Sequence, residues 1–574
     1  SDFGHFPKGL LYGIQCLDSW LYDDMKPFLH LEALDTYKFL KEQVDTDYFE
    51  QLIQKYLIDN THASVVIIEP CRGLNAKNEA ELEKKLAAYK ESLSDAQIEQ
   101  LIADTKHLAE YQETPSPKED LEKIPMLSRA DMKKEAAPFY NEEKKIDDVT
   151  VVHHNIFSNG IIYLSLLFDI EHIPAEDIPY LGILKGVLGY MDTEHYTYAD
   201  FANEVNIHTG GIGSSIGIYP GTKTQNDYKA KFEVRAKALP DETKTAVHLM
   251  EEMLFGSKFE DEKRLYEIIA ELKSRLQVSI SSAGHSVAST RAMSYFSKAA
   301  AYKDSIQFYE LLCDLEAHFE EKKEMLTAKL RTMTKQIFTR ENLICSVTCD
   351  ENGYSNAKTA LESFLPKLFA TVDRRGKTEI IPEKKNEGFM DASQVMYVAR
   401  AGNFRAHGYD YTGALRILKV IMEYDYLWIN IRVKGGAYGC MNGYMKNGDT
   451  YFASYRDPNL EKTNEIYNKI PDYIEHFAAD ERDMTKYIIG TLSDLDIPMN
   501  PSTKGDRSMA AYLQDISYDE VQKERDQILT ATQEDIRGLK DMIASVLEEN
   551  NLCAVGNEEV LQAGKEMFME LKHF

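Results

Sequence analysis

The stretch Ile431-Arg432-Val433-Lys434-Gly435-Gly436-Ala437-Tyr438-Gly439-Cys440 decides the fold, because a helical pattern changes there into an extended one. Apolar residues before it recur at helical spacing: Leu415, Leu418, Met422, Tyr426 and Ile429. Two consecutive glycines are typical of a helix end, since glycine adopts the left-handed conformation that closes the last turn. We therefore expect a helix, a tight glycine turn and a strand.

Two polar side chains flank this turn. Arg432 is expected in the last helical turn and Tyr438 at the start of the strand, so both can converge on one point. Such a pair can bind a carbonyl oxygen and stabilise the negative charge that develops on it. Alternatively, the arginine satisfies the free carbonyls at the helix end and the tyrosine is half-buried on the sheet. Spacing alone leaves both interpretations open.

The surrounding sequence repeats one plan twice. Residues 161–170 and 394–400 are extended runs, and each is followed by an amphipathic helix, a glycine-rich turn, β-rich segments and a long helical stretch. Each copy closes on a similar strand, Glu341-Asn342-Leu343-Ile344-Cys345 or Asn550-Asn551-Leu552-Cys553. This order predicts α+β domains, each a mostly antiparallel sheet with helices on one face.

We divide the chain into four parts. Residues 1–72 are interpreted as the tail of an upstream α+β domain, with a buried strand predicted at 61–70. Residues 73–145 are predicted to form a helical hairpin linker, whose second helix starts at a capping-box pattern of Ser94 and Gln97. Residues 146–375 and 376–574 are predicted to be the third and fourth α+β domains.

Composition and charge limit the classes of function and the cellular location that we expect for this chain. The 574 residues carry a net charge of −28, which disfavours nucleic acid and favours basic peptides, although acidity also keeps a cytosolic protein soluble. An odd number of cysteines, seven, without a Cys-x-x-Cys pair speaks against disulfides and a thiolate zinc site. This cysteine usage fits a reducing cytoplasm best, and we predict a cytoplasmic protein. No signal peptide is visible at Ser1-Asp2-Phe3-Gly4, and no apolar run is long enough for a membrane span.

No metal motif is visible. Both His-Glu-x-x-His and His-x-x-Glu-His are absent, and His248-x-x-Glu251-Glu252 lacks the second imidazole. His153 and His154 are adjacent on a predicted strand, so their rings point to opposite faces and cannot easily share an ion. We therefore expect no metal in this chain.

A second glycine-rich turn, Gly210-Gly211-x-Gly213, superficially suggests phosphate binding. It lacks the P-loop lysine and the dinucleotide-binding spacing. Close approach of a peptide or of a neighbouring strand is an equally good explanation. We select four glycines as candidate substrate-binding positions: Gly210, Gly211, Gly435 and Gly436.

The pattern Arg432-x-Lys434-Gly435-Gly436-Ala437-Tyr438-Gly439 resembles the fourth-domain motif of the presequence-protease branch of the pitrilysin-type metallopeptidases (family M16, subfamily C). Other similar stretches occur along nearly the whole chain: Asn60-Thr61-His62 resembles the end of that family's second domain, and Ser158-Asn159-Gly160-Ile161 the opening strand of its third.

The resemblance implies the carboxy-terminal half of a two-half enzyme that closes around a chamber. The zinc and its inverted motif, His-x-x-Glu-His, would lie in the amino-terminal half, which is the expected partner together with unstructured peptide substrates. In this chain Ile183, Gly186 and Val187 stand where the motif would be. Arg432 and Tyr438 would be catalytic in the complete enzyme, whereas this chain alone would be inactive.

Two other functions are considered. One is a non-catalytic peptide-binding or assembly subunit of the same superfamily, which the sequence upstream of this chain would distinguish. The other is a nucleotide-binding protein that uses the glycine turn at Gly210, which would require saturable nucleotide affinity.

Overall fold

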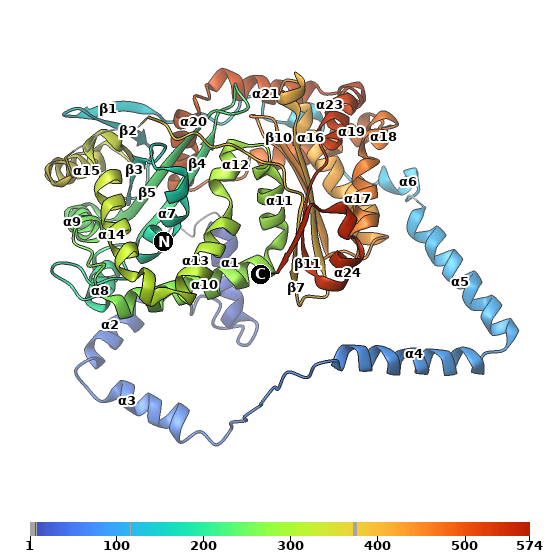
Figure 1. Ribbon diagram of the computed structural model, residues 1–574, viewed down its shortest axis with the longest axis horizontal. Helices are drawn as coiled ribbons and strands as arrows, with labels where there is room; N and C mark the ends of the chain where they lie inside the picture. Colours follow the sequence, from blue (N-terminus) through green and yellow to red (C-terminus); the bar gives the residue numbers. More distant parts are fainter. Residues whose placement is uncertain (1–5, 7, 115, 371–375, 574) are drawn as a thin grey trace. The chain divides into compact units, whose positions relative to one another are not determined.

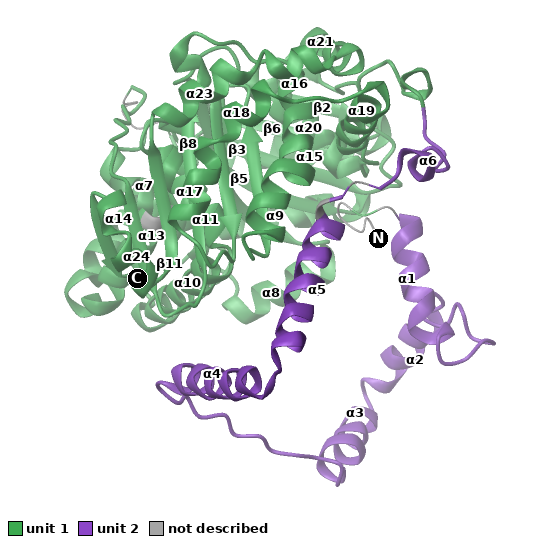
Figure 2. Cartoon of the chain, turned by 90° about the vertical axis from the view of Figure 1, so that its right-hand side faces the viewer, with its two compact units in different colours: residues 1–7, 128–574 green, residues 8–127 purple. Residues whose placement is uncertain are grey.

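The computed structural model describes residues 6, 8–114, 116–370 and 376–573 (Figure 1). Ser1 to Gly4 and the predicted boundary at residue 375 lie outside these residues. Two units are distinguished, one of residues 8–127 and one that contains residues 128–574 (Figure 2). Within the described ranges, no helix is both long and apolar enough to cross a membrane.

The unit of residues 8–127 is built of helices. They are α1 (Lys8–Trp20), α2 (Leu34–Gln43), α3 (Tyr48–Ile53) with its π-helical extension η1 (Gln54–Ile58), α4 (Leu74–Ser92), α5 (Asp95–Glu113) and α6 (Lys118–Leu121). The predicted capping box is present at the start of α5. The Gln97 amide donates to Ser94 Oγ at 3.4 Å, and the Ser94 amide donates to Gln97 Oε1 at 2.9 Å.

The strand predicted at residues 61–70 is wrong. These residues are neither helix nor strand, and Val65 and Ile68 are 89% and 88% exposed. A strand satisfies its amide and carbonyl groups only against a neighbouring strand. No strand within the described residues pairs with this segment, so its β-branched composition is not sufficient to form one.

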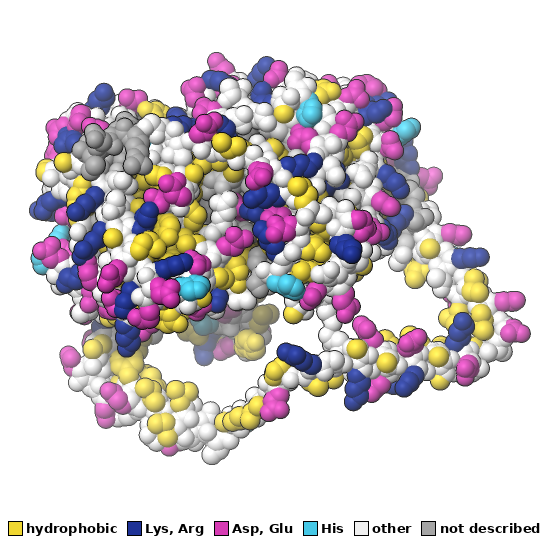
Figure 3. Space-filling view, viewed as in Figure 1, with side chains coloured by type: hydrophobic (Ala, Val, Ile, Leu, Met, Phe, Trp, Pro, Cys, Tyr) yellow, Lys and Arg dark blue, Asp and Glu magenta, His cyan; other side chains and the backbone are white. Residues whose placement is uncertain are grey.

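The two predicted linker helices are present, but their apolar stripes are not buried. Six apolar side chains on these two helices are about half exposed: Leu82, Leu86, Tyr89, Leu101, Ile102 and Leu108. Figure 3 shows the resulting apolar side chains along the surface of these helices. The apolar stripes are therefore exposed on the helices of this unit.

The first sheet lies in the unit that contains residues 128–574 and has six strands in the described residues. They are β1 (Glu142–Ile146), β2 (Val149–Asn155), β3 (Ile162–Asp169), β4 (Ile212–Pro220), β5 (Tyr228–Ala238) and β6 (Leu343–Cys349). Their order is β1-β2-β6-β3-β5-β4, and every pair is antiparallel except β2 with β6.

The second sheet has the same plan. Its described strands are β7 (Glu387–Asp391), β8 (Met396–Asn403), β9 (Gly439–Tyr444), β10 (Asp449–Tyr455), β11 (Asn551–Asn557) and β12 (Glu570–His573). The order β12-β7-β11-β8-β10-β9 matches β2-β6-β3-β5-β4 strand for strand from β7 onward. The closing strands β6 and β11 both lie inside their sheets, each parallel to one neighbour (β2 or β7) and antiparallel to the other (β3 or β8). The repeated α+β plan is therefore confirmed.

Helices complete each copy. The first carries α7 (Ile178–Val187), α8 (Tyr198–His208), α9 (Thr243–Phe255), α10 (Glu262–Ser282), α11 (Gly284–Ser294), α12 (Lys298–Lys303), α13 (Ser305–Ala317), α14 (Phe319–Ile337) and α15 (Glu351–Phe364). The second carries α16 (Ala414–Ile421), α17 (Glu461–Asn468), α18 (Ile470–Glu475), α19 (Glu481–Leu495), α20 (Pro501–Gln514), α21 (Tyr518–Thr530), α22 (Gln533–Arg537), α23 (Lys540–Glu548) and α24 (Glu558–Ala563).

Each sheet packs one face against helices of its own copy. Period-2 alternation on β5 places Ala230, Phe232 and Val234 in the first core, all fully buried. The opposite face of the sheet is also covered at β5. Glu233 lies between Phe232 and Val234 and points to that face, and it is only 1% exposed. Its carboxylate accepts hydrogen bonds from Arg235 and the Tyr219 hydroxyl.

The two copies exchange one helix each. Helix α20 of the second copy lies on the first sheet, where Met509 and Leu513 pack with Val152 and Leu167. Helix α11 of the first copy lies on the second sheet, in a core of small and aromatic side chains that includes Ala288, Ala292, Tyr397, Ala399 and Ala453. Residues 128–574 are therefore one interlocked body rather than two separable domains.

Candidate functional site

The helix that leads to the glycine turn is long and irregular. Helix α16 continues through two π-helical segments, η8 (Met422–Tyr426) and η9 (Trp428–Val433). Its apolar face, including Leu415, Leu418 and Ile431, is fully buried and anchors the helix against the second sheet. The π-helical turns widen the helix near its end, a feature that occurs often at functional sites.

Gly436 closes this helix in the predicted way. Its φ of +82° is left-handed, and its amide donates to the Arg432 carbonyl at 2.9 Å. The next amide, of Ala437, donates to the Ile431 carbonyl at 3.1 Å. At Gly435 an added Cβ would lie 2.4 Å from the Ile431 carbonyl oxygen, so the backbone contact itself requires glycine.

The turn brings Arg432 and Tyr438 together. The Arg432 guanidinium carbon lies 5.2 Å from the centre of the Tyr438 ring and 4.3 Å from that of Trp428. Nη1 of Arg432 also donates a hydrogen bond to the Tyr438 carbonyl. Tyr438 comes just before β9, where its amide donates to the Tyr455 carbonyl at 3.0 Å, and its ring meets the Tyr455 ring edge-on at 5.7 Å.

Both functional groups remain available to a ligand. The Tyr438 side chain is 63% exposed, and within the described part of the chain its hydroxyl has no hydrogen-bond partner. No described carboxylate pairs with Arg432, whose observed partners are a carbonyl and two aromatic rings. A cation held over aromatic faces and a free phenol hydroxyl form a donor pair suited to a developing oxyanion.

The other glycine turn lies against a neighbouring strand. The Gly210 amide donates to the Lys237 carbonyl at 2.7 Å, and an added Cβ would lie 2.6 Å from the Lys237 side chain. Gly211 has a φ of +121° and open space beside it. Close approach of a strand therefore explains Gly210, whereas Gly211 remains open to a ligand.

The two glycine turns occupy equivalent places in the repeat. Gly210 and Gly211 precede β4, and Gly435 and Gly436 precede β9, each the outermost strand of its sheet. A cavity of about 260 Å³ beside the first turn is lined by residues that include Ser346, Thr348 and Asp506, but by neither Arg432 nor Tyr438. The structure thus joins Arg432 with Tyr438 and does not join them to Gly210.

The helix expected at the lost zinc motif is α7. Ile183 and Val187 are fully buried in the first core, and an added Cβ at Gly186 would lie 2.5 Å from Leu272. Apolar, closely packed positions cannot ligate an ion, so these three residues do not fit a zinc site.

The histidines that the sequence analysis assessed as possible metal ligands contact nearby carboxylates, carbonyls or a hydroxyl. His248 Nδ1 lies 3.5 Å from Glu251 on the same helix, whereas Glu252 accepts from His195 at 2.7 Å. His153 and His154 point to opposite faces of β2 as predicted. His154 contacts the Tyr140 carbonyl and the Ser346 hydroxyl, whereas His153 contacts the Cys349 carbonyl.

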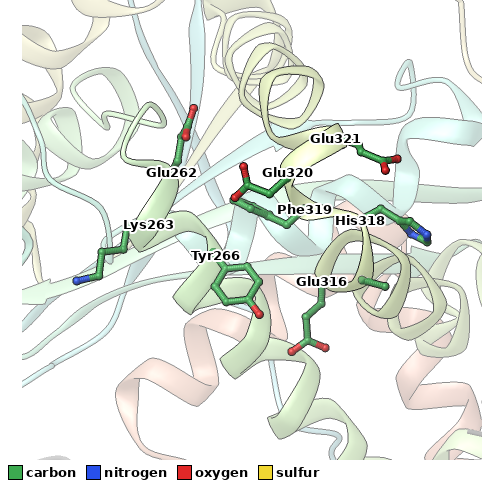
Figure 4. A pocket seen from close by; sticks show the side chains of 9 residues that line it. Glu262, Lys263, Tyr266, Glu316, His318, Phe319, Glu320 and Glu321 are labelled. Atoms are coloured by element: carbon green, nitrogen blue, oxygen red, sulfur yellow. The ribbon is translucent and has the colours of Figure 1, made fainter.

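A cavity of about 590 Å³ between α10 and α14 does not coincide with these residues. Figure 4 shows Tyr266 in its middle, with Lys263 directed away and the acidic side chains Glu262, Glu316, Glu320 and Glu321 around it. Lysines already neutralise part of this charge, since Lys323 contacts Glu262 and Glu320 at 2.8 Å. Neither Arg432 nor Tyr438 lines this cavity.

One cluster of possible metal-ligating side chains was not predicted from the sequence. Glu142, His153 and Glu351 bring three potential ligand atoms within 4.8 Å of one another. The register of β1 and β2 places Glu142 opposite His153, and Glu351 begins the helix that follows β6. Only the hairpin pairing of Glu142 with His153 could have been anticipated, because Glu351 is brought in by the parallel pairing of β2 with β6.

Solved structures show the class of fold. A conserved protein from Enterococcus faecalis V583 aligns with a TM-score of 0.53 at 13% identity, over 73% of this chain and 99% of that chain. An inactive domain of a peptidase M16 from Pseudomonas fluorescens aligns with a TM-score of 0.51 at 13% identity, over 73% and 98%. The described strands and helices thus have an M16 peptidase fold.

Sequence comparisons give the family. Residues 68–315 match the peptidase M16C associated family, and residues 386–558 match the PreP C-terminal domain. Protein HypA of Clostridium perfringens is 38% identical over 574 residues, which cover all of this chain and 59% of that protein. Presequence protease 1 of Arabidopsis thaliana is 28% identical over 593 residues, covering all of this chain and 54% of that protein.

The chain belongs to the M16C peptidase family and corresponds to the carboxy-terminal half of a presequence-protease-like protein. It spans between half and three fifths of the length of these two relatives.

Proposed function

We propose that the chain is the carboxy-terminal half of a zinc-dependent endopeptidase that degrades unstructured oligopeptides. In this proposal it closes the chamber and supplies Arg432 and Tyr438 as oxyanion-stabilising groups, with Gly211, Gly435 and Gly436 near the substrate backbone. The zinc and the residues that bind it belong to the amino-terminal half, which is the partner of this chain. The observation that carries the proposal is the convergence of Arg432 and Tyr438 at the glycine turn, where no described carboxylate pairs with the guanidinium and the exposed Tyr438 hydroxyl has no described hydrogen-bond partner.

The chemical role of the pair follows from its groups. The Tyr438 hydroxyl donates to the carbonyl oxygen of the scissile bond, and the Arg432 guanidinium adds positive charge beside it. Both interactions strengthen as negative charge develops on that oxygen, so they lower the barrier more than they improve substrate binding. Activation of water would depend on the metal held by the amino-terminal half. The residues of this chain take no part in that step.

Charge and cysteines support two further parts of the proposal. The net charge of −28 favours basic peptides among the substrates by long-range attraction. All seven cysteines are free thiols, in keeping with a reducing, cytoplasmic location.

Complementation tests the proposal. The chain is assayed for cleavage of an unstructured, basic fluorogenic peptide, alone and after mixing with a separately produced amino-terminal half. We expect no cleavage by either half and cleavage by the mixture. Cleavage by this chain alone contradicts the proposal, and a mixture that binds peptide without cleaving it supports the alternative of a non-catalytic peptide-binding subunit.

A further inference from the structure

The buried ring of His153 has one nitrogen without a partner. Its side chain is fully buried, and its Nε2 lies 3.1 Å from the Cys349 carbonyl oxygen. A carbonyl only accepts hydrogen bonds, so Nε2 carries a proton, and in the neutral ring Nδ1 therefore carries the lone pair. No hydrogen-bond donor reaches Nδ1 in the described residues.

This lone pair faces two carboxylates. Nδ1 lies 3.7 Å from an oxygen of Glu142 and 3.8 Å from an oxygen of Glu351. Burial, reinforced by the charge of Lys144, lowers the pKa of His153 and so favours the neutral ring. Three electron-rich atoms facing one another are unfavourable unless a cation lies between them.

We propose that Glu142, His153 and Glu351 form a binding site for a divalent transition-metal cation such as Zn²⁺, separate from the catalytic zinc of the proposed enzyme. A neutral imidazole with two carboxylates is a donor set that such ions accept, and three protein ligands leave a position for water. The hydrogen bond from Nε2 to a backbone carbonyl is the arrangement that orients histidine ligands in metal sites.

Metal binding requires the three ligand atoms to move only slightly closer together. Ligand atoms around a tetrahedral Zn²⁺ are about 3.3–3.6 Å apart, given bonds of about 2.0–2.2 Å. The Glu142 and Glu351 side chains are 52% and 67% exposed, so they can rotate inward, whereas His153 is held by its hydrogen bond and by the Tyr354 ring at 4.4 Å. The rigid ligand is therefore the histidine, and the carboxylates adapt.

Lys144 is the competing cation. Its Nζ lies 3.3 Å from Glu351, 3.7 Å from Glu142 and 4.1 Å from the centre of the Tyr354 ring. The ammonium balances the carboxylate charge but gives no hydrogen bond to Nδ1 of His153. A metal ion must displace it, so removal of this charge should strengthen metal binding.

The test measures Zn²⁺ binding to the full chain by calorimetry after removal of metal with a chelator. We expect saturable binding at this site, weakened about tenfold or more by Glu142→Gln and by Glu351→Gln, and strengthened by Lys144→Met. Glu362→Gln is the matched control, because Glu362 is an exposed glutamate on the same helix as Glu351 and lies outside the site. His153 itself is not replaced, because a buried ring also supports folding.

Thermal unfolding provides a second readout. Because the site joins the β1–β2 hairpin to helix α15, bound Zn²⁺ should raise the unfolding temperature of the wild type and of Glu362→Gln, but not of Glu351→Gln. Absence of saturable Zn²⁺ binding, or equal binding by Glu142→Gln, Glu351→Gln and Glu362→Gln, would overturn the proposal. These results do not depend on peptidase activity, so the proposed function is tested separately.

Discussion

Nε of Arg291 donates to Oε2 of Glu387 at 2.6 Å, and this buried ion pair joins helix α11 of the first copy to strand β7 of the second. The Glu387 carboxylate is completely buried, and it also receives hydrogen bonds from the Tyr295 hydroxyl and from Lys572. Burial raises its pKa, but the positive charges and hydrogen bonds outweigh burial and hold the pKa below its usual value.

Glu387→Gln should therefore destabilise the interlocked body of residues 128–574. Loss of the Glu387 charge leaves Asp304 as the remaining carboxylate partner of the buried Arg291 and weakens the hydrogen bonds to Glu387, at a cost of about 1–3 kcal/mol. Denaturant unfolding measures the change. The control is Glu362→Gln, whose exposed partner Lys358 lies 3.7 Å away, and it should change stability by less than about 0.5 kcal/mol. Equal effects of the two substitutions would show that the buried pair contributes nothing specific.

Gly436→Ala should loosen the turn that holds Arg432 and Tyr438. The φ of +82° costs an alanine about 1–2 kcal/mol, although its Cβ would meet only Pro458 at an ordinary 3.6 Å. The loss is conformational rather than steric, and it is measured as a lower unfolding temperature. Gly213→Ala is the control, since Gly213 has no neighbour within 4 Å and no left-handed φ. An unchanged unfolding temperature for Gly436→Ala would refute the helix-closing role.

His154 should make the fold sensitive to acid. Burial lowers its pKa to about 4, and its neutral ring contacts the Tyr140 carbonyl and the Ser346 hydroxyl. An unfolded histidine has a pKa of about 6.5, so between these values the unfolded chain binds a proton that the folded chain does not. Stability contributed by the neutral ring is therefore complete above about pH 6.5 and is lost as the pH falls toward 4, by up to about 3 kcal/mol.

Urea unfolding at pH 7 and pH 5 measures this contribution. The decrease in stability between the two pH values should be smaller in His154→Gln than in the wild type. His248→Gln, which replaces a half-exposed histidine on helix α9, should keep the wild-type decrease. The same decrease in all three proteins would mean that His154 does not titrate as described.

Local patterns predicted the parts of the fold that depend on neighbouring residues. The helix end at Gly436, the capping box at Ser94 and the alternation along β5 each depend on a few consecutive residues and were predicted correctly. The repeated order of elements also predicted the α+β class, because the copies share the same succession of strands and helices.

Features that depend on distant residues were not predictable. Residues 61–70 have strand composition, but a strand needs a partner, and none of the described strands pairs with them. The exchange of α11 and α20 between the two sheets leaves no periodic signal that distinguishes it from packing within one copy. Likewise, His153 meets Glu351 only after β2 and β6 have paired.

The turnover of Tyr438→Phe in the two-half enzyme tests the central claim most directly. Loss of one oxyanion donor should lower kcat about 10²–10³-fold, with little change in KM. Stability should be unchanged, because Tyr438 is 63% exposed and its hydroxyl makes no hydrogen bond within the described residues. Tyr424→Phe, at a tyrosine 69% exposed on the same helix, is the control and should retain full turnover. Wild-type kcat in Tyr438→Phe would contradict the account.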